Sequence, residues 1–285
     1  MTMIDLSRYA AFLFDLDGTL WTGSELYDGA LELVRFLADS RRRIVIVSNN
    51  SVLTGDRVVA DLAARGLEAS LQAVTVTDVA GEFVRAHGCR VVRVVGAVAL
   101  ARVCRDAGLD VVDPLSERRA DAILLGRDVS FTYELLERLA ARAADGELLI
   151  ATNEDAYHPG PGGSRVPETG ALLAAIRTVA GCDYLSVGKP GPLLFDRALE
   201  RAGVSSRDAV MIGDNLDTDV AGAVRAGMDA IWISLDRTAA AATEPPPVAT
   251  YPTLREFAVH CTGSMNGTPA TALNYPRGHR PLPID

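Results

Sequence analysis

The sequence of 285 residues contains almost no lysine. Lysine and arginine together number 28, and Lys189 is the single lysine among them. The formal net charge is −9, because 37 residues are acidic. A general nucleic-acid-binding protein needs basic patches, so this charge balance argues against one. A compositional bias toward arginine accounts for the scarcity of lysine, but it leaves open why position 189 is an exception.

Closely spaced cysteines and long apolar runs are also missing. The four cysteines lie far apart in the sequence and form no CxxC pair: Cys89, Cys104, Cys182 and Cys261. This spacing argues against a disulfide framework or a zinc site. The apolar run at residues 10–14 is too short for a signal peptide, and no segment approaches the ~18 apolar residues of a membrane span. We therefore expect a soluble, cytoplasmic protein with no membrane partner.

Apolar residues are abundant, at 48% of the chain, and they are arranged in a regular alternation. Short apolar segments predict strands at residues 11–14, 43–47, 91–95, 122–125, 147–151, 184–187, 209–212 and 230–233. Amphipathic segments predict helices at residues 26–38, 56–65, 98–107, 133–143, 170–180, 193–202, 219–226 and 254–260. This order predicts an α/β fold with a Rossmann-like, doubly wound parallel sheet and helices on both faces.

Polar clusters follow four of the predicted strands, at residues 15–19, 48–50, 188–190 and 213–219. Ligands of an open parallel sheet bind beyond the carboxyl ends of its strands. The clusters contain several carboxylates, neutral hydrogen-bonding groups and one cation. Oxygen ligands suit a hard divalent cation such as Mg²⁺, whereas zinc prefers histidine or cysteine. The pattern therefore predicts a magnesium-assisted phosphoryl site.

The chemistry of such a site suggests a role for each charged residue. Asp15, at a strand end, can attack phosphorus and form an aspartyl-phosphate. Asp17 would protonate the leaving group and then deprotonate the attacking water. Asp214 would complete the metal site, and Asp219 would hold a metal-bound water as an outer ligand. Lys189 would offset negative charge on the attacking and transferred groups.

The second cluster supplies neutral groups for the substrate: Ser48, Asn49 and Asn50 are candidates for binding phosphate oxygens. Each cluster taken alone also has an ordinary structural explanation. Aspartate often forms turns, and serine, asparagine or aspartate often caps a helix. The order of all four clusters, and their common position at strand ends, favours the catalytic interpretation.

These clusters resemble the four motifs of the haloacid dehalogenase superfamily of hydrolases. FLFDLDGTL, IVIVSNN, VGKP and MIGDNLDTD occur in the expected order between residues 12 and 219. The subtype resembles subfamily IIA, the group of NagD, 4-nitrophenylphosphatases and pyridoxal-phosphate phosphatases. The resemblance implies a discontinuous catalytic core at residues 1–79 and 183–260, with an inserted α/β cap of the C2 type at residues 80–182. Residues 261–285 are expected to form a flexible tail.

The resemblance also implies how the site residues are used. It makes Asp15 the nucleophile and Asp17 the general acid and base. It implies that Mg²⁺ is held by the side chains of Asp15 and Asp214 and by the backbone carbonyl of Asp17. The presence of Asp17 favours a phosphatase over a dehalogenase, because cleavage of a carbon–halogen bond needs no such acid.

We expect the cap loop at residues 153–170 to determine substrate specificity. Its Asp-Ala-Tyr-His-Pro segment resembles the cap loop of eukaryotic pyridoxal-phosphate phosphatases, which makes Tyr157 and His158 candidates for substrate contact. The alternative for His158 is a hydrogen bond to the backbone. Arg165 could hold a second anionic group or be solvated. Glu168 replaces the first glycine of the Pro-Gly-x-Gly pattern that is usual in this group, so the backbone of the loop is expected to differ.

Together these features predict a magnesium-dependent phosphatase that acts on a small phosphorylated metabolite. Candidate substrates are a sugar or polyol phosphate, glycerol 3-phosphate, phosphoglycolate and pyridoxal 5′-phosphate. One alternative is a mutase or other phosphotransferase that uses the same aspartyl-phosphate. Another is a non-catalytic binding protein, although such a protein has no need of an acid/base residue. Relatives often pair through their caps, so a homodimer is expected.

Overall fold

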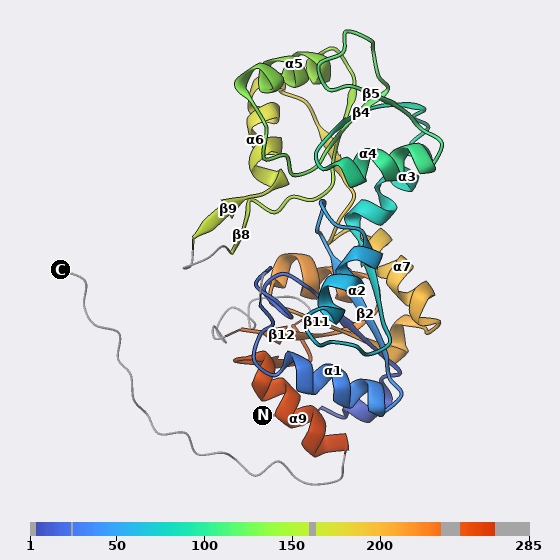
Figure 1. The fold of residues 1–285 in the computed structure, drawn as a ribbon, viewed down its shortest axis with the longest axis vertical. Coiled ribbons are helices and arrows are strands. Elements are labelled where there is room, and N and C mark those ends of the chain that lie inside the picture. The colour runs from blue at the N-terminus through green and yellow to red at the C-terminus, as the bar shows by residue number, and fades with distance from the viewer. Residues whose placement is uncertain (1–3, 24, 160–163, 235–245, 266–285) are drawn as a thin grey trace, which may run out of the picture.

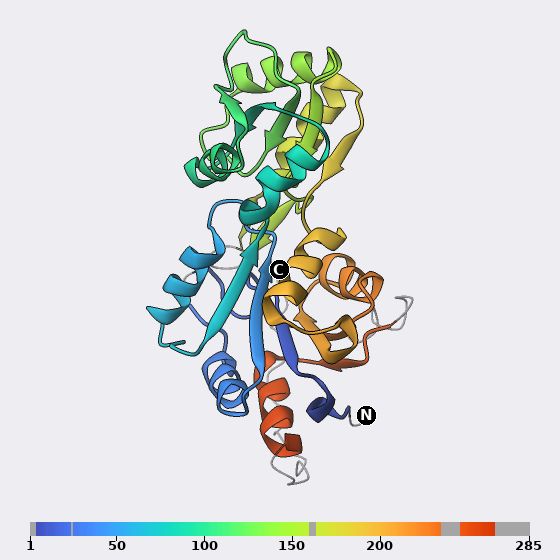
Figure 2. The same ribbon diagram turned by 90° about the vertical axis from the view of Figure 1, so that its right-hand side faces the viewer.

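The computed structural model describes residues 4–23, 25–159, 164–234 and 246–265. These residues form two parallel sheets that follow one another along the long axis of the molecule (Figures 1 and 2). Helices flank both sheets, so the predicted α/β class is confirmed. Among the described residues, the helices are all too short or too polar to cross a membrane.

The larger sheet has six strands in the order β13-β12-β11-β1-β2-β3, and every neighbouring pair is parallel. Its strands are β1 (Ala11–Phe14), β2 (Arg43–Ser48), β3 (Leu71–Thr75), β11 (Ala209–Gly213), β12 (Asp229–Ile233) and β13 (Ala249–Tyr251). All four residues of β1 are buried, because this strand lies inside the sheet and helices cover both faces. Burial on both faces explains why such strands are continuous apolar runs in the sequence.

The helices of the larger sheet divide between its two faces. One face packs against α1 (Ala30–Asp39), α2 (Gly55–Ala63) and α9 (Leu254–Met265). The other face packs against α7 (Pro192–Ala202) and α8 (Ala221–Arg225). Each longer helix is amphipathic and turns its apolar side to the sheet.

The smaller sheet has five parallel strands in the order β10-β7-β6-β4-β5. Its strands are β4 (Val91–Val95), β5 (Asp110–Val112), β6 (Ala122–Leu125), β7 (Leu148–Ala151) and β10 (Tyr184–Ser186). Helices α3 (Val76–Ala86) and α4 (Val98–Asp106) pack on one face. Helices α5 (Tyr133–Ala144) and α6 (Thr169–Ala180) pack on the other. The chain enters this sheet after β3 and leaves it before β11.

The strand that leads to Lys189 was expected to resume the larger sheet, but it does not. Strand β10 pairs with β7 in the smaller sheet, with Tyr184 opposite Leu149. The place beside β2 is taken by β3, which the apolar pattern did not identify. Both sheets are built from short parallel apolar strands, so the local sequence of a strand does not show which sheet it joins.

Two further elements differ from expectation. The cap loop contains a short antiparallel hairpin of β8 (Tyr157–Pro159) and β9 (Arg165–Pro167). Helix α9 continues through residues 261–265, where the tail was expected to begin, and Cys261 is fully buried. The rest of the predicted tail, residues 266–285, lies outside the described residues.

Candidate active site

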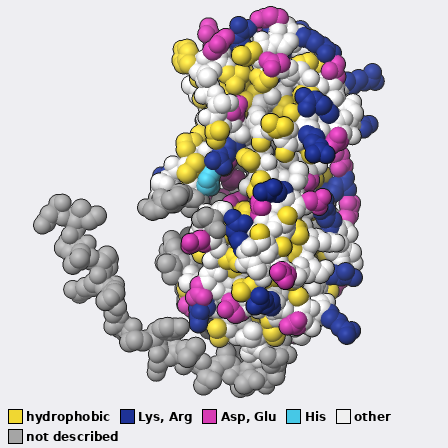
Figure 3. Space-filling model, in the orientation of Figure 1, with side chains coloured by type: hydrophobic (Ala, Val, Ile, Leu, Met, Phe, Trp, Pro, Cys, Tyr) yellow, Lys and Arg dark blue, Asp and Glu magenta, His cyan; other side chains and the backbone are white. Residues whose placement is uncertain are grey.

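A cavity of about 550 Å³ lies where the two sheets meet, and both sheets contribute to its walls. Figure 3 shows the molecule narrowing at this level between an upper and a lower lobe. The cavity brings together ten of the residues that the sequence singled out, and Arg165 is not among its lining residues. The ten are Asp15, Asp17, Ser48, Asn49, Asn50, Tyr157, His158, Lys189, Asp214 and Asp219. They follow β1, β2, β10 and β11 or belong to the cap loop, as the strand-end argument predicts.

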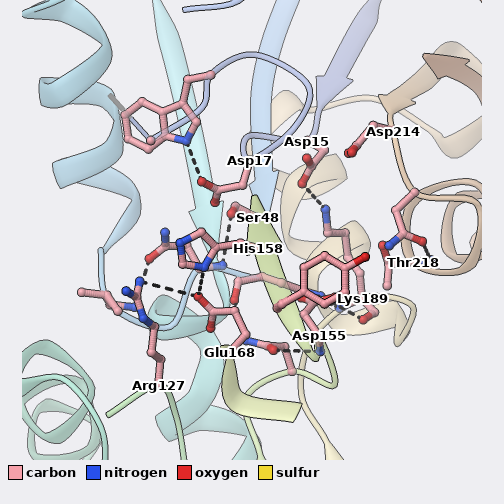
Figure 4. A pocket seen from close by; sticks show the side chains of 18 of the residues that line it. Asp15, Asp17, Ser48, Arg127, Asp155, His158, Glu168, Lys189, Asp214 and Thr218 are labelled. Atoms are coloured by element: carbon pink, nitrogen blue, oxygen red, sulfur yellow. Dashed lines mark hydrogen bonds and ion pairs between the residues drawn. The ribbon is translucent and has the colours of Figure 1, made fainter. Parts of the chain in front are cut away.

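Lys189 lines the cavity and lies between two aspartates, one of which is Asp15 (Figure 4). Its Nζ donates hydrogen bonds to Asp15 Oδ1 at 2.6 Å and to Asp219 Oδ1 at 2.7 Å. The side chain is only 2% exposed. Burial disfavours the ammonium ion, but the two carboxylates outweigh burial and raise the pKa of Lys189. The residue is therefore a fixed positive charge beside Asp15.

Three carboxylates crowd around this single ammonium. Oxygen atoms of Asp15, Asp214 and Asp219 lie within 4.8 Å of one another. Burial, reinforced by the charge of Asp219, raises the pKa of Asp214 to about 7. Burial also raises the pKa of Asp15, although Lys189 opposes the effect. The excess of negative charge and the all-oxygen donor set fit a hard divalent cation.

Gly18 allows the loop after β1 to approach Asp214. Its φ of +98° lies in the region that favours glycine, and a Cβ at this position would lie 2.4 Å from Asp214 Oδ2. The turn closes with a 3.0 Å hydrogen bond from the Gly18 N–H to the carbonyl of Trp21. Glycine at position 18 therefore permits the tight backbone of this turn.

The Asp17 carboxylate lies in the same turn and is held by a residue that the sequence reasoning missed. Trp21 Nε1 donates a 2.8 Å hydrogen bond to Asp17 Oδ1 (Figure 4). Asp17 is not one of the three clustered carboxylates. The available sequence signal was an aromatic donor four residues after Asp17, next to a glycine turn.

Ser48 and Asn50 lie in the loop that follows β2. Ser48 Oγ accepts a 3.1 Å hydrogen bond from the Asn50 N–H, and the serine is 1% exposed. Asn50 Oδ1 accepts hydrogen bonds from the N–H groups of Val52 and Leu53. This carbonyl oxygen shapes the loop, as the helix-capping alternative for such residues anticipates.

The amide of Asn49 joins the loop after β2 to Lys189 and to the cap. Its Oδ1 accepts from the Lys189 N–H at 2.7 Å, and its Nδ2 donates to the Lys189 carbonyl at 3.1 Å. Nδ2 also donates to Asp155 Oδ2 at 3.0 Å, and Asn153 Nδ2 donates to the Asn49 carbonyl at 2.9 Å. Gly188 makes room for this packing, because a Cβ there would lie 2.4 Å from Asn49 Oδ1. The Asn49 side chain thus orders the site in addition to lining it.

The cap loop places His158 against an acidic side chain. His158 Nδ1 and Glu168 Oε1 are 2.7 Å apart, and Arg127 Nη1 lies 3.6 Å from the same oxygen (Figure 4). His158 therefore bonds a side chain and not the backbone, which was the alternative weighed for it. Tyr157 is 45% exposed, and the Arg165 guanidinium lies 4.6 Å from the centre of its ring. Arg127 and Glu168 both line the cavity, although the sequence reasoning assigned neither to the site.

Two family models match the chain. One describes a haloacid dehalogenase-like hydrolase and matches residues 12–110. The other describes a HAD-hydrolase-like domain and matches residues 186–257. The matched segments contain the four strand-end clusters and leave out most of the smaller sheet.

Curated relatives and solved structures agree with these models. Chronophin from Mus musculus is 35% identical over 237 residues, which cover 79% of this chain and 81% of chronophin. Acid sugar phosphatase from Staphylococcus saprophyticus is 28% identical and covers 88% of this chain and 97% of its own. The structure of 4-nitrophenylphosphatase from Thermotoga maritima matches with a TM-score of 0.78 and 30% identity, over 90% of this chain and 98% of its own. NagD from E. coli K-12 matches with a TM-score of 0.75 and 26% identity, over 87% and 98% of the two chains.

Proposed function

Because this chain belongs to the haloacid dehalogenase-like hydrolases and is a phosphatase of subfamily IIA, we propose that it hydrolyses a small phosphomonoester through an aspartyl-phosphate on Asp15. The observation that carries the proposal is the contrast between two neighbouring carboxylates. Asp15 is 7% exposed and bound by Lys189, whereas Asp17 accepts a hydrogen bond from Trp21 and lies outside the group of three clustered carboxylates. Two carboxylates in different surroundings can take different roles.

The reaction has two steps, and Asp17 serves both. In the first, a carboxylate oxygen of Asp15 bonds to phosphorus, the bond to the leaving oxygen breaks, and Asp17 gives that oxygen a proton. In the second, Asp17 takes a proton from water, the water oxygen bonds to phosphorus, and Asp15 leaves as inorganic phosphate forms. Lys189 orients Asp15 and offsets the charge of the phosphoryl oxygens.

We further propose Mg²⁺ as the cofactor, held by the side chains of Asp15 and Asp214 and by the backbone carbonyl of Asp17. When bound, the ion would neutralise negative charge on the phosphoryl group and on the clustered carboxylates. The support for this assignment is the all-oxygen donor set and its excess of negative charge over the single ammonium of Lys189. Asp219 stays a candidate for holding a metal-bound water, in addition to its bond to Lys189.

The cap is proposed to close over the substrate and exclude water. A cavity of about 550 Å³ suits a small phosphorylated metabolite. A sugar or polyol phosphate, glycerol 3-phosphate, phosphoglycolate and pyridoxal 5′-phosphate remain the candidates.

The division into a core at residues 1–79 and 183–260 and a cap at residues 80–182 remains a proposal, with β10 added to the cap sheet. Cytoplasmic location and pairing through the cap also remain predictions.

Phosphate release from a panel of phosphorylated metabolites and 4-nitrophenyl phosphate tests the proposal. We expect the wild type to release phosphate, Asp15→Asn to lose about 10³-fold or more of that activity, and both proteins to have the same circular dichroism. Asp196→Asn, an exposed aspartate of α7, is the matched control and should retain wild-type activity. EDTA should silence the enzyme and Mg²⁺ should restore it.

Three results would contradict the proposal or its parts. Wild-type turnover by Asp15→Asn would remove Asp15 as the nucleophile. Activity that EDTA does not change would contradict the assignment of a metal cofactor. Transfer of phosphate to another sugar hydroxyl, without accumulation of inorganic phosphate, would favour the mutase alternative.

A further inference from the structure

Glu168 is the acidic residue of the cap loop whose two carboxylate oxygens are both bonded within the cavity wall. Oε1 is 2.7 Å from His158 Nδ1 and 3.6 Å from Arg127 Nη1. Oε2 accepts a 3.3 Å hydrogen bond from the Thr169 N–H, at the start of α6. The side chain is 15% exposed. Glu168 therefore joins three elements that lie apart in the sequence: the loop after β6, the hairpin β8–β9 and helix α6.

This bonding sets the orientation of the His158 ring. A carboxylate accepts hydrogen bonds, so Nδ1 carries the proton in this contact and Nε2 is the ring nitrogen left for a ligand. His158 is 27% exposed and lines the cavity. The ring thus offers one nitrogen to a ligand while Glu168 prevents it from turning.

Glu168 also neutralises a cation. Arg127 and Lys189 are the two basic side chains that line the described part of the cavity, whereas seven aspartates and glutamates line it. Lys189 is already engaged by two aspartates. Arg127 is held from both ends, because its backbone N–H donates to Ser51 Oγ at 3.1 Å and its guanidinium pairs with Glu168. Arg165, the sequence candidate for a second anionic group, lies against the Tyr157 ring and is not among the residues that line the cavity. No unpaired cation is then left among the described lining residues for a second anionic group of the substrate.

Glu168, His158 and Arg127 lie at the end of the cavity that the leaving group of the substrate would occupy. Figure 4 shows Asp15 and Asp214 on one side of the cavity and His158, Glu168 and Arg127 on the other, with Asp17 between them. The phosphoryl group belongs beside Asp15, and the leaving oxygen belongs beside Asp17. The remainder of the substrate then extends toward His158.

We propose that Glu168 is a specificity-determining residue that makes this end of the cavity accept an uncharged, hydroxyl-bearing leaving group and disfavour one with a second negative charge. The inference rests on the proposed function, since it concerns the leaving group of the same reaction. It narrows the substrate candidates toward sugar and polyol phosphates and away from phosphoglycolate. Burial raises the pKa of Glu168, and the neighbouring Arg127 and His158 oppose that rise.

Glycerol 3-phosphate and 3-phosphoglycerate test the inference, because they differ in a hydroxymethyl group against a carboxylate. The measured quantity is kcat/KM for glycerol 3-phosphate divided by kcat/KM for 3-phosphoglycerate. We expect a ratio above one for the wild type. Glu168→Gln keeps the size of the side chain but releases Arg127, so the ratio should fall about tenfold, mainly through KM. Arg127→Gln leaves Glu168 uncompensated, so it should change the ratio in the opposite direction.

The matched control is Glu154→Gln. Glu154 belongs to the same loop, but it is exposed, bonds the Tyr184 hydroxyl and does not line the cavity. Its substitution changes the net charge equally and should leave the ratio within about twofold of wild type, since it removes no contact with the ligand. A general folding defect would lower kcat/KM for both substrates together. The inference instead requires the ratio to shift in opposite directions in the Glu168 and Arg127 variants.

A wild-type preference for 3-phosphoglycerate, or an unchanged ratio in both variants, would overturn the inference. The proposed function would survive that result as long as the wild type releases phosphate from 4-nitrophenyl phosphate. If no substrate releases phosphate, the proposed function itself fails. The two failures are therefore distinguishable.

Discussion

Among the described residues two cations are buried, Lys189 at the candidate active site and Arg93 in the region of the smaller sheet, and their charges are satisfied in different ways. In the cap, Arg93 is fully buried on β4 and forms two 3.0 Å hydrogen bonds with the carboxylate of Glu147. Its remaining N–H groups donate to backbone carbonyls of residues 113, 114, 116 and 118. One positive charge therefore meets one negative charge, and the guanidinium is bonded on all sides.

Positive and negative charge are not balanced in this way around Lys189. Its ammonium faces Asp15 and Asp219, and Asp214 is close to both carboxylates. A buried ion pair with matched charges and complete hydrogen bonding holds a structure in one arrangement. A buried cluster with surplus charge costs stability unless a ligand completes it, and such clusters are typical of functional sites. The difference distinguishes the structural ion pair of Arg93 from the proposed catalytic cluster around Lys189 without reference to sequence motifs.

The largest expected effect comes from Lys189. Lys189→Met should lower kcat about 10³-fold, because Asp15 loses its partner and the phosphoryl oxygens lose a fixed charge. Lys189→Arg should also lower kcat strongly, because a wide planar guanidinium does not fit where a compact ammonium lies between two carboxylates. Turnover of 4-nitrophenyl phosphate at saturating substrate measures both. Near-normal activity of Lys189→Arg would show that position 189 needs only a positive charge.

The next effect should appear in stability and not in chemistry. Arg93→Met leaves Glu147 as an unpaired buried charge, and we expect a loss of about 3–5 kcal/mol in the free energy of unfolding. Urea denaturation followed by circular dichroism measures this loss, and kcat per folded molecule should change little. The double variant Arg93→Met/Glu147→Leu should recover much of the stability, since no charge is then left buried.

Arg102→Met is the matched control for the Arg93 variant. Arg102 and Asp106 form a 3.8 Å ion pair on α4, and their side chains are 80% and 70% exposed. Exposed pairs of this kind contribute about 0–1 kcal/mol, so the control should unfold close to wild type. A loss of activity in Arg93→Met at full folding would instead make Arg93 a positioning residue, because its buried side chain does not line the cavity.

The smallest effect is expected at Trp21. Trp21→Phe keeps an aromatic ring but removes the hydrogen bond to Asp17, so kcat for an alkyl phosphate should fall about tenfold. The loss should be smaller for 4-nitrophenyl phosphate, whose leaving group needs less help from a proton donor. Measuring kcat with both substrates distinguishes positioning of Asp17 from a general defect, which would slow both equally.

The sequence predicted which residues line the site better than it predicted which side chains they bond. Eight of the ten cavity-lining candidates belong to polar clusters that follow buried strands, and such clusters emerge at the carboxyl ends of parallel strands. The other two, Tyr157 and His158, lie in the hairpin of the cap loop. The partners of those residues were not predictable. Phosphate binding by Asn49 stays a prediction, and no pattern in the sequence indicated that its amide also bonds Lys189 and Asp155. Glu168 was expected to alter the loop backbone, and its side chain proves to join His158 to Arg127.

The sequence by itself determined the α/β class, the four strand-end clusters and the phosphatase family, because these depend on residues close together along the chain. It also marked Lys189, the single lysine, as unusual. Only the tertiary structure decided that β10 joins the smaller sheet and that Lys189 lies between Asp15 and Asp219. Lys189 and Asp15 are separated by 174 positions in the sequence. A contact of that kind forms only when two sheets pack together, so no local pattern of residues can specify it.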